Sequence, residues 1–320
     1  MSRRILFRVA QAALIALVAS FIVIYLARSW GKVRAYPWEM RPAPLLGSLA
    51  LFLVFYWLNG VAWWLLLRGF GLQAGRSRAV ATWGQSILAR YIPGNVFMFV
   101  GRAVLSARQG LPVPVVGAAM VYEQALGFCG ALVAAALLFP FWRNEPTVAV
   151  WSLAALPVLL AFLHPRVFAP LAARLLRLAR RAPLERVLGY RTVLGMLAFF
   201  VGLWIVAGAA CYLAVAAVTD AGPSLLPLVT VAYALAYVAG MVAFVVPSGV
   251  GVREAVLAAA LVGSLPGGVA LAWALLLRVW QTLIELVFVA LASLAGRSAP
   301  PGVPNGPVEG ETREEPADQG

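Results

Sequence analysis

The segment Phe244–Ala255, FVVPSGVGVREA, places two charged residues directly after a break in a long apolar tract. Arg253 carries a planar, permanently charged guanidinium group, which suits the oxygen atoms of a phosphate. The glycines before it let a ligand approach the backbone, and a helix that begins here directs free amide groups toward an anion. Glu254 has the chemistry to orient Arg253 or to bind an amine. The segment therefore predicts a binding site for an anionic or zwitterionic group.

A second stretch, RYIPGNVFMFVGR from Arg90 to Arg102, repeats these residue types around a proline and a glycine. The apolar tracts that follow the two stretches add further charged and amide side chains. Charged residues at membrane depth are costly and usually mark a functional site. The candidate binding residues are Arg90, Tyr91, Pro93, Gly94, Asn95, Arg102, Tyr122, Glu123, Pro247, Ser248, Gly249, Gly251, Arg253, Glu254, Arg278, Gln281 and Glu285.

Several of these residues also have a purely structural interpretation. Arg90 and Arg102 lie within reach of a membrane surface, where a long cationic side chain can extend to the headgroups. Arg278 and Glu285 are on one helical face and can pair with neighbouring helices. The sequence leaves both interpretations open.

The composition predicts an all-α, polytopic helical membrane protein. Of its 320 residues, 63% are hydrophobic and only 12% are charged. Full-length apolar tracts lie at residues 6–27, 44–67, 115–141, 147–163, 193–218 and 268–294. The first is longer than the core of a signal peptide, so we expect it to be retained as a membrane span.

Two further tracts, residues 79–109 and 225–264, are interrupted near their middle by proline and glycine. Proline removes a backbone donor and clashes with the preceding turn, so each tract is expected to form two short helices joined at a break. Such breaks are tolerated at membrane depth only inside protein or beside a polar cavity. Each tract is therefore interpreted as a re-entrant hairpin.

With these hairpins, both halves of the chain have the same predicted order of elements, which is span, span, hairpin, span. The halves are residues 1–141 and 147–295. Three crossings in each half reverse the orientation of the second half, and such inverted repeats are typical of transporters. We therefore predict one transmembrane domain over residues 1–295. A plain bundle of eight kinked helices is the alternative.

Charge is distributed unevenly along the chain. Residues 296–320 form a Pro/Gly/Glu-rich tail that is expected to be disordered, and residues 1–295 carry 23 basic against 7 acidic residues. The excess gathers in loops, as the positive-inside rule describes, so nucleic-acid binding is not supported. We expect a cell (inner or plasma) membrane protein with the N-terminus and the loop 164–191 in the cytoplasm. The loop 28–43 is more basic than this topology predicts for an external loop.

The motifs YIPG at 91–94, Tyr122-Glu123 and PSGVGVRE at 247–254, taken in order with Arg102, carry a family resemblance. The chain resembles the flippase-like transmembrane region of the lysylphosphatidylglycerol synthase family over most of residues 1–295. The resemblance implies translocation of lipid between leaflets, with these residues around the path of the headgroup. In the synthases a large soluble domain follows this region. Here a short tail follows, so synthase activity is not expected.

No catalytic, metal or cofactor motif stands out in the sequence, and Cys129 and Cys211 suit packing within apolar tracts. An enzyme is therefore not expected, and neither is a cofactor or a metal site. Two hypotheses remain. The first is a flippase-like transporter of an anionic or zwitterionic phospholipid or a polyprenyl-phosphate-linked lipid, whose halves rock around the two hairpins. The second is a non-transporting membrane partner that presents lipid to a separate glycosyltransferase or synthase, with a basic surface helix at 166–181 as its docking face.

Overall fold

The computed structural model describes residues 27–91, 96–142, 188–243 and 249–297, together with residues 23 and 24 and single positions between 157 and 174. All regular structure within these residues is helical. Among the described residues, five helices are long and apolar enough to cross a membrane: α2 (Pro42–Gly69), α5 (Val113–Trp142), α8 (Tyr190–Ala216), α9 (Leu225–Val242) and α11 (Gly267–Arg297). The predicted all-α polytopic membrane protein is confirmed.

Four predicted spans coincide with helices of the structure. The tracts 44–67, 115–141, 193–218 and 268–294 correspond to α2, α5, α8 and α11. The predicted spans 6–27 and 147–163, the surface helix at 166–181 and the tail 296–320 fall wholly or largely outside the described residues.

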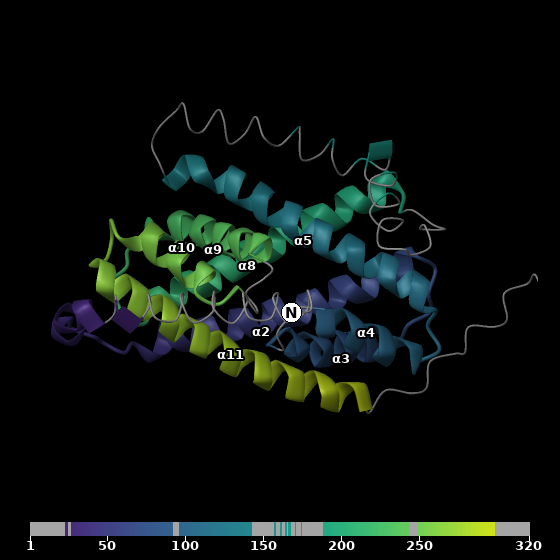
Figure 1. Ribbon diagram of the computed structural model, residues 1–320, viewed down its shortest axis with the longest axis horizontal. Coiled ribbons are helices and arrows are strands. Elements are labelled where there is room, and N and C mark those ends of the chain that lie inside the picture. The colour runs from purple at the N-terminus through teal and green to yellow at the C-terminus, as the bar shows by residue number, and fades with distance from the viewer. Residues whose placement is uncertain are drawn as a thin grey trace, which may run out of the picture.

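The long helices bury small residues against one another and expose large apolar residues outward. Gly130 allows α5 to approach the backbone of Phe200 on α8, and Gly208 of α8 lies directly against Thr230 of α9. Small residues at an interface are the usual way in which membrane helices come close. In Figure 1, α5 crosses α8 and lies above α9, and α11 runs along the lower edge of the bundle beside α3 (Arg76–Ile87).

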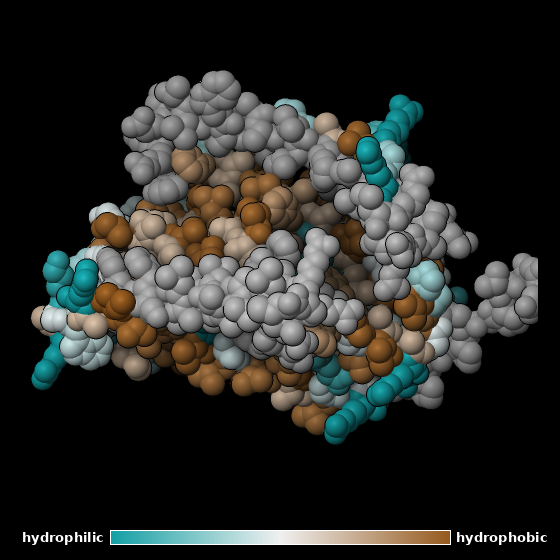
Figure 2. All heavy atoms as spheres, viewed as in Figure 1, coloured by the Kyte–Doolittle hydropathy of each residue, from teal (hydrophilic) through white to brown (hydrophobic). Residues whose placement is uncertain are grey.

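The outward face is apolar between two polar ends. The exposed side chains of α11 include Leu276, Val279, Leu283 and Leu291. Figure 2 shows the same division on one face of the molecule, where hydrophobic residues occupy the middle and hydrophilic residues gather at the ends. This distribution is typical of a protein surrounded by lipid, because exposed apolar area costs nothing in a hydrocarbon environment.

The first broken tract folds as an antiparallel helical hairpin. Its arms are α3, which ends in the 3-10 turn η1 (Leu88–Tyr91), and α4 (Val96–Ala107). Two hydrogen bonds join the arms: Gln109 donates to the hydroxyl of Thr82 at 2.6 Å, and the Nε of Arg102 donates to the hydroxyl of Ser86 at 2.9 Å. The two short helices predicted for this tract are therefore present.

The second broken tract also folds back on itself, but its arms are unequal. The first arm, α9, has 18 residues, and the second arm, α10 (Val252–Leu261), has 10. At 1.5 Å per residue α9 is about 27 Å long, which approaches the thickness of a bilayer core. The sequence predicted two short arms, because a proline marks the position of the break but not the residue at which helical hydrogen bonding stops.

Contacts between helix ends bring together the loops that the predicted topology places on the same side of the membrane. Arg41, before α2, pairs with Asp220 after α8 at 3.0 Å, and this hydrogen bond raises the pKa of Arg41. At the other end, Gly69 lies next to Leu188, just before α8. Arg78, Gln109 and Arg297 line a shared groove. Loops expected on one side of the membrane therefore lie at one end of the bundle, while the side that faces the cytoplasm stays a prediction.

Candidate functional site

A cavity of about 310 Å³ lies among the helices and is lined by both hairpins. The first hairpin contributes Arg90, Met98, Phe99 and Arg102, and the second contributes residues of α9 and α10 together with Gly249. The helices α2, α5, α8 and α11 complete the wall. Its volume is at the small end of the range for ligand pockets, so it suits a headgroup rather than a whole lipid.

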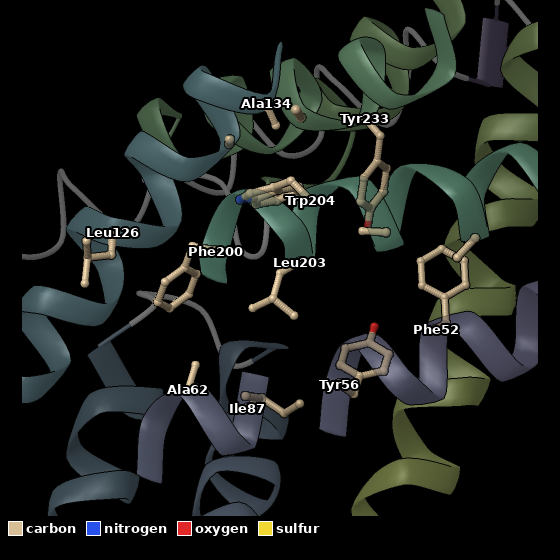
Figure 3. Close-up of a cluster of buried hydrophobic side chains, with 14 of the residues drawn as sticks. Phe52, Tyr56, Ala62, Ile87, Leu126, Ala134, Phe200, Leu203, Trp204 and Tyr233 are labelled. Atoms are coloured by element: carbon tan, nitrogen blue, oxygen red, sulfur yellow. The ribbon is translucent and has the colours of Figure 1, made fainter. Parts of the chain in front are cut away.

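Aromatic side chains form much of the wall. Figure 3 shows Tyr56 of α2 and Tyr233 of α9 with their hydroxyl groups directed into the space between the two helices. Trp204 of α8 contacts Tyr237 with ring centroids 4.5 Å apart, and its indole donates to the carbonyl of Gly127 at 2.9 Å. These partners restrict the rings, and rigid amphipathic rings suit the surroundings of a lipid headgroup.

A buried ion pair joins the second arm of the first hairpin to the span after it. Arg102, only 1% exposed, pairs with Glu123 of α5, and Glu123 also accepts a hydrogen bond from the indole of Trp83 at 2.6 Å. The guanidinium group stacks over Trp63 at 4.8 Å. Breaking one partner of such a pair leaves an uncompensated buried charge, so the network locks α3, α4 and α5 together.

Two more ion pairs involve α11. Arg90, at the break of the first hairpin, pairs with Glu285, whose side chain is fully buried. Arg278 pairs with Glu254 of α10, with 3.8 Å between Nε and Oε1. Three of the four candidate arginines are thus already compensated by a carboxylate.

Glu254 also caps its own helix. The backbone amide of Gly251 donates to Oε2 of Glu254 at 2.5 Å, just before α10 begins. Gly251 has a φ of 86°, a left-handed conformation that favours glycine. The carboxylate of Glu254 therefore already occupies part of the N-terminus of α10, which was predicted to bind a ligand. Glu254 pairs with Arg278, and not with Arg253, for which it was one predicted orienting partner.

Arg253 lies in a different environment. Its guanidinium group sits 5.7 Å from the ring centroid of Tyr233 and 5.8 Å from that of Tyr237, and it lines the cavity. Within the described part of the chain no ion pair joins Arg253 to a carboxylate. Its aliphatic stem crosses Gly240, where an added Cβ would lie 2.6 Å from Cγ of Arg253. Glycine at position 240 is thus required for the position of this arginine.

Residues 11–301 match the family model described as Lysylphosphatidylglycerol synthase TM region. The chain belongs to this family. No curated protein sequence matches the chain. As a member of the lysylphosphatidylglycerol synthase TM family, it is an integral membrane protein with a lipid-related function. The match includes both hairpins and every residue that lines the cavity.

In this family member, the residues predicted from sequence fall into three groups. Those that line the cavity are Arg90, Arg102, Glu123, Gly249, Arg253 and Gln281. Those that contact this first group or support the second hairpin are Gly251, Glu254, Arg278 and Glu285. Those whose placement or side chain lies outside the described residues are Tyr91, Pro93, Gly94, Asn95, Pro247 and Ser248.

Tyr122 is the exception among the predicted residues. It is buried against Phe70, with ring centroids 5.6 Å apart, and does not line the cavity. The reason is helical geometry, because neighbouring residues on a helix point in different directions and Glu123 takes the inward position.

Several residues of the cavity wall were not among the binding residues predicted from the sequence. Tyr233, Tyr237 and Gly240 follow one another at helical spacing on α9 and form the surface on which Arg253 rests. This spacing was the available signal, but tyrosine and glycine in an apolar helix also suit ordinary packing. Among the described residues no group of three His, Cys, Asp or Glu side chains is placed to hold a metal ion.

Proposed function

We propose that this protein is a flippase-like transporter that moves a phosphate-bearing lipid between the leaflets of its membrane. The observation that carries the proposal is the position of Arg253, a cation at the break of one hairpin that faces a cavity bordered by the other hairpin. A helix break beside a polar cavity at membrane depth is the usual construction of a transporter binding site.

Each part of the cavity has a role in this function. The guanidinium fork of Arg253 binds phosphate oxygens, and the aromatic wall holds the remainder of the headgroup. The cavity is too small for acyl chains, so the chains stay among the surrounding lipids. Rocking of the two halves around the hairpins then exposes the headgroup site to each leaflet in turn. The ion pairs Arg102–Glu123 and Arg278–Glu254 keep the hairpin arms attached to their spans during this motion.

The test is a leaflet-exchange assay on the purified full chain in proteoliposomes. Phosphatidylglycerol with a fluorescent label on one acyl chain is bleached from outside, with and without an imposed membrane potential and pH gradient. We expect wild type to exchange lipid faster than protein-free vesicles, and Arg253→Gln to reduce the rate at least about tenfold, because a charge-assisted hydrogen bond is lost. Arg297→Gln, at the exposed end of α11 and outside the cavity, is the matched control.

Two outcomes would count against the proposal. If wild type exchanges lipid no faster than empty vesicles under every gradient, the transport function is wrong. The hypothesis of a non-transporting partner for a separate glycosyltransferase or synthase then takes its place. If Arg253→Gln and Arg297→Gln both match wild type, transport stands but the site does not.

A further inference from the structure

The charges around the cavity do not balance. Arg90, Arg102 and Arg278 are each paired with a glutamate, and Arg253 has no such pair in the described part of the chain. The undescribed residues at the two breaks, 92–95 and 244–248, include no acidic residue. Counted over the residues that the structure describes, the cavity and the side chains directly behind it therefore carry one net positive charge.

We propose that the cavity selects a headgroup with a single negative charge, which is the charge of a phosphodiester without an added amine. The inference rests on the proposed function and specifies the substrate class of the same site. One phosphodiester neutralises Arg253 and leaves every other charge in its existing pair. The cost of an unbalanced charge is large in a medium of low dielectric constant, so the best ligand is the one that brings the total to zero.

Lipids with other charges are disfavoured for identifiable reasons. A phosphomonoester or a pyrophosphate brings at least one charge too many, and balancing it requires breaking an existing ion pair such as Arg90–Glu285. A zwitterionic headgroup brings an ammonium group that needs a carboxylate. Glu123 is the one carboxylate in the described wall of the cavity, and Arg102 and Trp83 already occupy it.

The aromatic surroundings support the same assignment. Two tyrosine rings lie against the guanidinium group of Arg253 and interact with it as a cation–π pair. These rings stabilise the positive charge without neutralising it, so the guanidinium keeps its capacity to bind an anion. A carboxylate partner would have removed that capacity, as Glu123 does for Arg102.

The experiment measures equilibrium lipid binding by native mass spectrometry on the purified full chain. Three lipids with identical acyl chains compete at pH 8: phosphatidylglycerol with one negative charge, zwitterionic phosphatidylethanolamine, and phosphatidic acid, whose phosphomonoester loses its second proton near neutral pH and is then mainly a dianion. Wild type is expected to prefer phosphatidylglycerol to both. Arg253→Gln, which removes the net charge, is expected to lower the preference over phosphatidylethanolamine at least about tenfold.

Two variants separate charge from shape. Glu285→Gln leaves the charge of Arg90 uncompensated, so the preference should move toward phosphatidic acid. The double variant Arg90→Gln, Glu285→Gln restores one net charge, and the preference should return to phosphatidylglycerol. Arg297→Gln serves as the control outside the cavity. If Glu285→Gln does not fold, the double variant and Arg253→Gln still decide between the outcomes.

The proposal is overturned if wild type binds the three lipids equally. It is also overturned if the double variant shows the same weakened preference for phosphatidylglycerol as Arg253→Gln. Its failure is distinct from failure of the transport function. Exchange of lipid between leaflets without charge selectivity leaves transport standing, whereas selective binding without exchange leaves the charge assignment standing and removes transport.

Discussion

At the scale of single residues, Arg253 differs from the other arginines by its neighbours rather than by its chemistry. Arg102 is buried and neutralised by Glu123, while Arg253 rests on two tyrosine rings and on the bare backbone of Gly240. A glycine on one helix can thus determine where a cation on the next helix points. Gly249, with a φ of 64°, lies against Gly240 and the stem of Arg253.

We predict that Gly240→Ala will impair lipid binding without unfolding the protein. The new Cβ would lie 2.6 Å from Cγ and 2.9 Å from Cδ of Arg253, so the flexible arginine stem must move. The affinity for phosphatidylglycerol should fall several-fold, and the binding assay described above checks it. Gly202→Ala on α8 is the control, because its Cβ would meet no atom within 4 Å. Equal affinity of both variants would show that Gly240 has no positioning role.

At the scale of secondary-structure elements, both hairpins are held by the same kind of contact. The second arm of each hairpin forms an ion pair with the span that follows it: Arg102 of α4 with Glu123 of α5, and Glu254 of α10 with Arg278 of α11. The two pairs have opposite polarity. The hairpin arm provides the arginine in the first half of the chain and the glutamate in the second half. This correspondence fits an inverted repeat, which stays a prediction.

We predict that Glu123→Gln will destabilise the first hairpin by about 3 to 5 kcal/mol, because Arg102 then remains buried without a carboxylate. The double variant Arg102→Met, Glu123→Leu should recover much of this loss, since neither charge is then buried. Thermal unfolding in detergent measures both. An Asp220→Asn control removes an exposed ion pair with Arg41 and should leave the unfolding temperature unchanged. If Glu123→Gln is as stable as wild type, the Arg102–Glu123 pair has no structural role.

At the scale of the whole molecule, the arrangement of helix ends agrees with the predicted topology. The loop before α2 meets the loop after α8, and the end of α2 meets the start of α8. The central cavity lies between hairpins that the predicted topology inserts from opposite faces. In the proposed mechanism, a change in the packing of the two halves gives each leaflet in turn access to a headgroup bound there.

We predict that residues 70–75 face the cytoplasm and residues 220–224 face the opposite side. Gln73→Cys and Ser224→Cys each introduce a thiol at an exposed position, and both native cysteines are buried. A membrane-impermeant maleimide should label only the Ser224→Cys variant in intact cells and both variants after permeabilisation. The reverse result would invert the orientation. Labelling of both variants from one side would contradict the arrangement of the helices.

The membrane class, four of the spans and the two breaks could be predicted from the sequence alone. Each of these follows from local properties, because apolar length and proline position act on a segment without reference to its neighbours. The sequence also identified Arg253, since a charge beside glycines in an apolar tract is unusual wherever the tract folds. The unequal arms of the second hairpin were not predicted, because the end of α9 depends on where its last carbonyl groups find partners.

Which charges remain available for a ligand depends on how the helices pack. The sequence lists four arginines and three glutamates in the apolar tracts, but many pairings among them are compatible with their spacing. Packing of α11 against the first hairpin and α10 pairs Glu285 with Arg90 and Glu254 with Arg278, while Tyr233 and Tyr237 shelter Arg253. An ion pair depends on the distance between atoms far apart in the chain. The net charge of the cavity therefore becomes visible only when the helices are packed.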